Sequence, residues 1–86
     1  MKLLVFTAVW CRPCQSMKPY LSALDGIVEY EIIDADETPE LMTQYNVRGV
    51  PTLIMLKDHK EVARQVGAVS QTRLLEWVKD AQTINK

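Results

Sequence analysis

Histidine and cysteine are both scarce in this sequence, which has one histidine and two cysteines. A structural zinc site needs about four ligands, most of them of these two kinds. His59 is far along the chain from Cys11 and Cys14, and only carboxylates remain to complete a site. We therefore interpret His59 as a solvated turn residue and expect no bound metal.

Long apolar segments and an excess of charge of one sign are lacking as well. The longest apolar stretch runs from Leu3 to Cys11, with Thr7 inside it, and is too short to span a bilayer. Ten basic against eleven acidic residues leave a net charge of -1, which indicates neither a nucleic-acid footprint nor a polybasic membrane patch. We expect partners that are proteins or small thiols, with no nucleic acid and no membrane.

A signal peptide is not predicted either. Lys2 precedes the apolar run, but the run leads directly into Trp10 and the cysteines, so cleavage there would destroy the motif. We therefore expect a cytoplasmic protein. Its 86 residues, 48% hydrophobic and 24% charged, are typical of one small globular domain covering residues 1–86. In a reducing cytosol a close cysteine pair is catalytic or metal-binding more often than structural.

Both cysteines fall in the stretch Trp10-Cys11-Arg12-Pro13-Cys14, where an apolar run gives way to helical periodicity. The positions Met17, Leu21 and Leu24 continue from Cys14 at steps of three and four, which predicts a helix that ends at Asp25-Gly26. This stripe places Cys14 on the core side and Cys11 at the exposed amino end. A disulfide across so short a loop stabilises the fold by only about 2 kcal/mol, which favours a redox centre over a structural bridge.

The remaining pattern predicts an α/β fold. Strands are expected at Lys2–Thr7, Ile27–Asp34, Leu53–Leu56 and Glu61–Val66, the last with alternating faces. Further helices are expected from Pro39 to about Tyr45 after a Thr38 cap, and after a Ser70 cap with Leu74, Trp77, Val78 and Ala81 as the packing stripe. The order β-α-β-α-β-β-α gives a four-stranded mixed sheet with helices on both faces, and we expect the tail from Thr83 to fray. Two glutamates in the second strand favour an edge position.

Four pieces of the sequence stand out together: Trp10 to Cys14, Pro19 in the following helix, Arg48-Gly49-Val50-Pro51-Thr52, and Val66-Gly67-Ala68 before the last helix. In these pieces the chain closely resembles the thioredoxin family. The resemblance implies a thioredoxin-like fold and covers nearly the whole chain. The length is similar to that of compact, glutaredoxin-sized members, because thioredoxins usually carry an extra amino-terminal strand and helix.

Several positions depart from the family pattern. Arg12 stands where thioredoxins usually have glycine, and Thr7 stands where a second tryptophan is common. Alignment through Trp10 and Pro51 puts Val5 and about Ile32 where a buried Asp and its Lys partner are usual. The proton acceptor commonly assigned to the buried cysteine is therefore missing.

The chemistry expected of the pair is thiol-disulfide exchange. Cys11 is the predicted nucleophile, because the amino end of a helix favours an anion, and Arg12 and the Cys14 thiol should further lower its pKa. Attack on a substrate disulfide gives a mixed disulfide, which Cys14 then resolves. Either water or the departing substrate thiolate has to accept the Cys14 proton.

The resemblance also implies a surface for substrates. Pro51 matches the family's cis-proline, beside which the backbone of Val50 can hydrogen-bond an extended substrate segment. Trp10, Arg12, Pro13, Gly67 and Ala68 complete the predicted substrate-binding set. Gly67 lets the partner backbone approach closely.

The expected function is that of a monomeric protein-disulfide reductase with no bound cofactor. By resemblance its electron donor is thioredoxin reductase, and ribonucleotide reductase is a plausible acceptor. A glutaredoxin-like enzyme that uses glutathione is the alternative, favoured by Arg12 and Val5, whereas Trp10 and Gly49-Val50-Pro51-Thr52 favour thioredoxin. A third reading is a non-catalytic subunit that uses the same fold to bind a partner.

Overall fold

The computed structural model describes residues 1–84 of the chain, and its elements follow the predicted order. They are β1 Lys2–Thr7, α1 Arg12–Leu21, a 3₁₀ turn η1 Ser22–Leu24, β2 Glu29–Asp34, α2 Pro39–Gln44, β3 Thr52–Lys57, β4 Lys60–Val66 and α3 Gln71–Gln82. The last two residues of the tail that was expected to fray, 85–86, lie outside the described residues. α3 ends at Gln82, and Thr83 and Ile84 beyond it donate backbone hydrogen bonds to Asp80 and Ala81; fraying of this tail stays a prediction.

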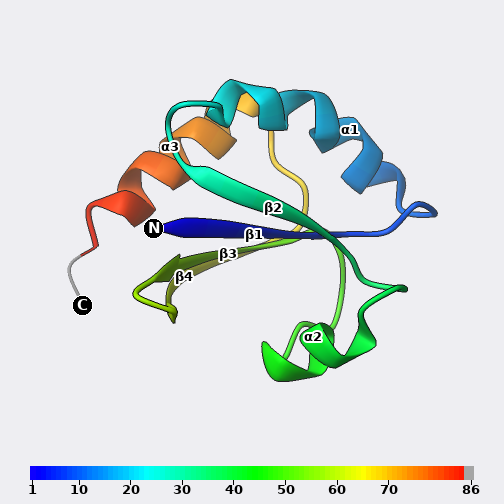
Figure 1. Cartoon of the computed structure of the whole chain (residues 1–86). Helices are drawn as coiled ribbons and strands as arrows, with labels where there is room; N and C mark the ends of the chain where they lie inside the picture. Colours follow the sequence, from blue (N-terminus) through cyan, green and yellow to red (C-terminus); the bar gives the residue numbers. More distant parts are fainter. Residues whose placement is uncertain (85–86) are drawn as a thin grey trace.

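The four strands form one mixed sheet in the order β2-β1-β3-β4 (Figure 1). β1 pairs with β2 in parallel and with β3 in antiparallel orientation, and β3 and β4 form an antiparallel hairpin. The helical crossover from β1 to β2 explains the parallel pair. The prediction of a mixed sheet with β2 at one edge is therefore confirmed.

Helices cover both faces of the sheet, with α1 and α3 on one side and α2 on the other (Figure 1). β1 is buried on both faces, as its uninterrupted apolar sequence predicts. Leu3 and Val5 pack in the cluster beneath α1 and α3, whereas Leu4 and Phe6 pack in the cluster beside α2. The predicted stripe of α3 is confirmed, because Leu74, Val78 and Ala81 are buried and Trp77 packs against the same cluster.

The segment between α1 and β2 differs from the prediction. The α-helix ends at Leu21, and the chain continues as the 3₁₀ turn to Leu24. The N–H groups of Ile27 and Val28 both donate to the Leu24 carbonyl, at 2.9 and 3.2 Å. They are therefore not available to the sheet, and β2 begins at Glu29 rather than at Ile27.

The hairpin between β3 and β4 turns through Asp58 and His59, which both have positive φ, 52° and 66°. Two such residues match the twist of the flanking strands. His59 is exposed in this turn, as predicted. The alternation predicted for β4 is wrong at Val62, because an irregularity in the pairing leaves Val62 and Ala63 packed against the same cluster.

The caps of the two later helices have different outcomes. Ser70 caps α3, its hydroxyl oxygen accepting from the Arg73 N–H at 3.2 Å. Thr38 occupies the cap position of α2, but its hydroxyl donates to the Asp34 carbonyl at 2.8 Å and does not cap the helix. Thr38 thereby ties the start of α2 to the end of β2.

Candidate active site

The two cysteines sit at the start of α1, directly beyond the carboxyl end of β1. Cys11 is the N-cap residue with extended backbone angles, and Cys14 lies in the first turn of the helix. A disulfide joins them, with their Cα atoms 5.3 Å apart. This placement follows from the connection between the parallel strands β1 and β2, because the chain leaves the carboxyl end of β1 and forms α1 before it enters β2.

Both cysteines are buried. Cys14 is fully buried, as the helical stripe predicts, but the expectation that Cys11 is exposed was wrong, since only 4% of its surface is accessible. The cause is a contact from elsewhere in the chain, because Val50 packs against the cluster formed by Ala8, Cys11 and Cys14. A contact across 39 residues of sequence is not visible in helical periodicity.

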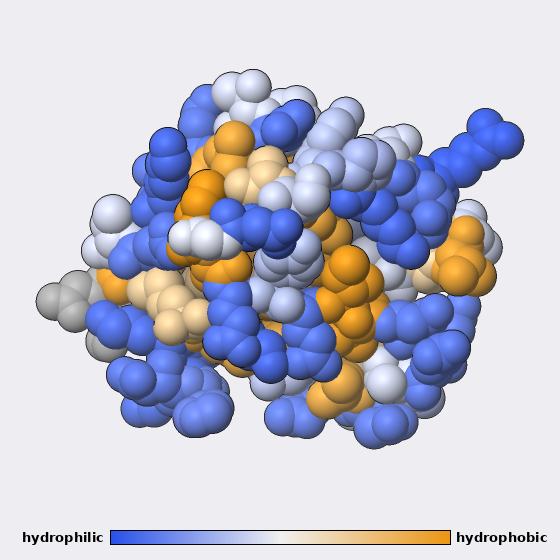
Figure 2. Space-filling view, turned by 45° about the horizontal axis from the view of Figure 1, so that its top comes forward, coloured by the Kyte–Doolittle hydropathy of each residue, from blue (hydrophilic) through white to orange (hydrophobic). Residues whose placement is uncertain are grey.

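A hydrogen-bonded turn carries the chain from β1 into the helix. The Cys11 N–H donates to the Ala8 carbonyl at 3.1 Å, which closes a four-residue turn around Val9 and Trp10. These two side chains are the turn's tip and are 73% and 68% exposed. A hydrophobic group is visible in Figure 2 at the end of the molecule where the chain enters α1.

The Cys11 sulfur is held by polar groups of the backbone. It accepts from the Cys14 N–H at 3.3 Å, which satisfies a donor at the amino end of the helix that would otherwise lack a partner. Val50 places its carbonyl oxygen 3.7 Å from the same sulfur. Pro13 has no N–H, and Arg12 and Pro13 are both exposed beside the disulfide.

The segment from Gly49 to Thr52 brings Val50 to the cysteines. The Val50–Pro51 peptide bond is cis, as the resemblance predicts. Thr52 is 2% exposed, and its hydroxyl donates to the Gly49 carbonyl at 2.7 Å, across the two residues between them. Among residues 1–84, the Val50 N–H donates to no backbone acceptor.

The third segment of the site is the one after β4. The Gly67 N–H donates to the Pro51 carbonyl at 2.9 Å, so Gly67 lies against the proline segment. Its φ of +96° is one that side-chain-bearing residues rarely adopt. Ala68 follows Gly67 and is exposed, and Val66 before it is 65% exposed.

Sequence reasoning missed some residues of this site. The Trp10 indole N–H donates to the Asp36 carboxylate at 2.8 Å, and the Asp36 N–H in turn donates to the Asp34 carboxylate at 2.9 Å. The available signal was the parallel register, which brings the ends of β1 and β2 to the same edge with Thr7 opposite Asp34. Val9 and Val66 were missed as well, although each adjoins a predicted site residue.

No carboxylate is buried in the described part of the chain, where the buried polar side chains are Thr7 and Thr52. Val5 is 1% exposed within an apolar cluster and lies opposite Ile32. Val5 and Ile32 thus supply neither an acid nor a base at these two positions. Within residues 1–84, no buried acid or base lies beside Cys14.

Two ion pairs on the surface shift the pKa of their basic partner. The hydrogen bond and charge of Glu31, whose carboxylate lies 2.8 Å from Lys2, raise the pKa of Lys2. The hydrogen bond with Glu61 likewise raises the pKa of Arg64. Both pairs stabilise the charged form of the base, and neither contacts the disulfide.

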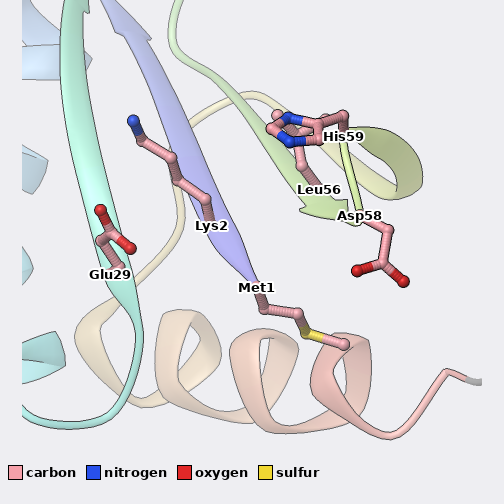
Figure 3. Close-up of a pocket in the computed structure, with 6 residues that line it drawn as sticks. All are labelled: Met1, Lys2, Glu29, Leu56, Asp58 and His59. Carbon is pink, nitrogen blue, oxygen red and sulfur yellow. The ribbon is translucent and has the colours of Figure 1, made fainter.

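Other possible sites are poorly developed. Within residues 1–84 no three side chains of His, Cys, Asp or Glu come together in a way that could hold a metal ion, and no helix there has the length and apolar character needed to cross a membrane. A hollow of about 410 Å³ lies at the amino end of β1. Figure 3 shows its charged side chains pointing in different directions, and none of them belongs to the disulfide site.

Comparison with known proteins places the chain in one family. A family model described as Thioredoxin matches residues 1–80. A thioredoxin of Rhodospirillum rubrum is 42% identical over 77 residues, which are 85% of this chain and 74% of that protein. A thioredoxin of Chlamydia trachomatis is 39% identical over 83 residues, 93% of this chain and 81% of that protein. The solved structure of a mutant thioredoxin from Halobacterium salinarum superposes with a TM-score of 0.87 and 32% identity, over 99% of this chain and 77% of that one.

Proposed function

The chain belongs to the thioredoxin family, and we propose that it reduces protein disulfides with Cys11 as the attacking sulfur and Cys14 as the resolving one. It is a thiol-disulfide oxidoreductase, and the observation that carries the assignment is the disulfide between Cys11 and Cys14 at the amino end of α1. The two roles follow from position, because Cys11 caps the helix whereas Cys14 lies inside its first turn.

The attack begins from the Cys11 thiolate. The Cys14 N–H at 3.3 Å and the amino end of α1 stabilise negative charge on this sulfur. The thiolate displaces one sulfur of the substrate disulfide, so that a Cys11–substrate disulfide forms and one substrate thiolate leaves. Arg12 adds an exposed positive charge beside the sulfur, where solvent screens it.

Resolution breaks the mixed disulfide. The Cys14 sulfur attacks Cys11, the Cys11–Cys14 bond forms, and the second substrate sulfur leaves with the bonding electrons. Cys14 is fully buried and no carboxylate in residues 1–84 is buried near it. The substrate thiolate released in the first step is a base already present beside the mixed disulfide, so we assign it as the acceptor of the Cys14 proton. The substrate gains two electrons and the protein is left oxidised.

Substrates dock on the surface around the disulfide. Trp10, Arg12, Pro13 and Ala68 are exposed there. Val50 packs against Cys11, Pro51 follows it, and Gly67 is hydrogen-bonded to Pro51. The Val50 N–H and C=O can pair with an extended substrate segment as a neighbouring strand would. The hydrogen bond from Gly67 to Pro51 holds the two backbone segments together.

The oxidised pair must be reduced again by another system. Members of this family are generally reduced by thioredoxin reductase and act on disulfide-containing proteins. For this chain we propose thioredoxin reductase as donor and ribonucleotide reductase as one acceptor. We also propose that residues 1–86 work as one domain and as a monomer in the cytoplasm, where a reducing pool keeps such pairs in use.

Insulin reduction tests the proposed function. The reduced wild type should reduce insulin disulfides, and Cys11→Ser should abolish this activity. A pure binding subunit would have no activity to lose, so an inactive wild type would contradict the proposal. Supplying electrons either from thioredoxin reductase with NADPH or from glutathione then identifies the donor. Faster turnover with glutathione would favour the glutaredoxin-like alternative.

A further inference from the structure

One carbonyl at the edge of the active site accepts two hydrogen bonds. The Ala8 oxygen receives the Cys11 N–H at 3.1 Å, the bond that closes the turn before the helix. It also receives the side-chain amide of Gln15, whose Nε2 lies 3.0 Å away. The acceptor of the turn is thus tied to the second turn of α1.

The position of Gln15 makes this contact possible. Long side chains on a helix point back toward its amino end, and Gln15 reaches seven residues back along the chain to Ala8. Its own backbone N–H donates to the Cys11 carbonyl at 3.1 Å. Gln15 therefore holds both ends of the turn, Ala8 through its side chain and Cys11 through its backbone.

The turn presents the two most exposed apolar side chains beside the disulfide, Val9 and Trp10. Asp36 is hydrogen-bonded to this turn through the Trp10 indole N–H, at 2.8 Å. Gln15 is hydrogen-bonded to it through the Ala8 carbonyl. With both anchors present, the apolar tip keeps one orientation relative to the Cys11 sulfur.

We propose that Gln15 is a positioning residue that orients the Val9–Trp10 tip for protein substrates. This inference rests on the proposed function. In a protein substrate, the residues on either side of the disulfide contact the Val9–Trp10 tip. Docking of such a substrate therefore depends on the orientation of Val9 and Trp10. A small disulfide needs to reach only the Cys11 sulfur, and its reduction depends much less on the tip.

The test compares substitutions at Gln15 that remove or keep the donor. Gln15→Met has a similar shape without a donor, Gln15→Glu replaces the donor with a carboxylate, and Gln15→Lys keeps an N–H that can reach Ala8. Ser16→Ala is the matched control on the same helix, where Ser16 is exposed and outside the site. Each variant is assayed with insulin and with a small aromatic disulfide, and its folding is checked by thermal melting.

Loss of the donor should raise KM for insulin about fivefold, the factor that one net hydrogen bond is worth, with kcat nearly unchanged. Gln15→Met, which adds no charge near Cys11, should show this, whereas the Ser16 control should stay close to wild type. With the small disulfide, Gln15→Met should change by less than about twofold. Gln15→Glu and Gln15→Lys also change the charge near the Cys11 thiolate, so for them the ratio of insulin to small-disulfide activity is compared. This ratio should fall in Gln15→Glu and stay close to wild type in Gln15→Lys. An unchanged KM for insulin, or an equal loss with both substrates, would overturn the inference.

Amide hydrogen exchange gives a second readout that needs no activity. The Cys11 N–H exchanges when the turn opens, and opening the turn also breaks the bond from Gln15 to the Ala8 carbonyl. Because Gln15→Met lacks that bond, exchange of the Cys11 N–H should become about fivefold faster. Unchanged exchange would overturn the positioning role even if the wild type reduces insulin. A wild type that fails to reduce insulin would instead contradict the proposed function.

Discussion

Thr52 supports the backbone that faces the nucleophile, and its hydroxyl can be removed without changing the shape of the side chain. The residue is 2% exposed, and its hydroxyl donates to the Gly49 carbonyl at 2.7 Å, across the Val50–Pro51 segment. Thr52→Val deletes this bond and leaves the carbonyl to water, because Gly49 is exposed. The expected loss is about 1 kcal/mol of unfolding free energy.

In a domain of this size that loss lowers Tm by roughly 4–8 °C. Thr52→Ser is the matched variant, because it keeps the hydroxyl and loses a buried methyl group, which also costs about 1 kcal/mol. The two variants should therefore melt at similar temperatures. They should differ in function, because only Thr52→Val frees the segment that places the Val50 carbonyl 3.7 Å from the Cys11 sulfur.

The assay is insulin reduction, together with calorimetry on the same samples. Thr52→Val should lower kcat/KM by up to about fivefold, the factor that corresponds to one net hydrogen bond, and Thr52→Ser should stay close to wild type. If both variants lose activity in proportion to their stability, the hydroxyl has no role in holding the docking segment and the reasoning is refuted.

Three further predictions concern single side chains. Cys14→Ser should accumulate a covalent complex between Cys11 and its substrate, visible by mass spectrometry, because the resolving sulfur is gone; a variant that turns over normally would contradict the assigned roles. Arg12→Gly should lower the reduction potential in a glutathione titration, because the reduced Cys11 thiolate loses a nearby positive charge. The shift should be only roughly 5–20 mV, since the Arg12 side chain is exposed, and a raised or unchanged potential would oppose this. Ser70→Ala should destabilise the protein by about 1 kcal/mol in urea unfolding, because the cap on the Arg73 N–H is lost, with Ser70→Asp as the variant that keeps a cap.

Much of the fold could be predicted because local patterns and tertiary packing agree. The continuous apolar run of β1 predicts burial on both faces, and the structure confirms it. The spacing of Cys14, Met17 and Leu21 predicts the buried side of α1, which is also confirmed. Helical periodicity is reliable here because one side of α1 must pack against the sheet.

Features set by contacts between distant segments could not be predicted in the same way. The burial of Cys11 depends on Val50, and the anchor of Trp10 depends on Asp36. The late start of β2 depends on the two hydrogen bonds that the Leu24 carbonyl accepts. The cis bond at Pro51 was anticipated from the family resemblance and not from the residue pattern.

The proposed mechanism requires that the Cys11 and Cys14 sulfurs differ in reactivity. Competitive alkylation of the reduced protein measures this difference directly. Iodoacetamide is added between about pH 5 and 9, and mass spectrometry follows modification at each cysteine. Cys11 should react first and already at a pH where ordinary thiols are slow, while Cys14 stays protected. Equal rates at the two positions, or faster modification of Cys14, would contradict the account.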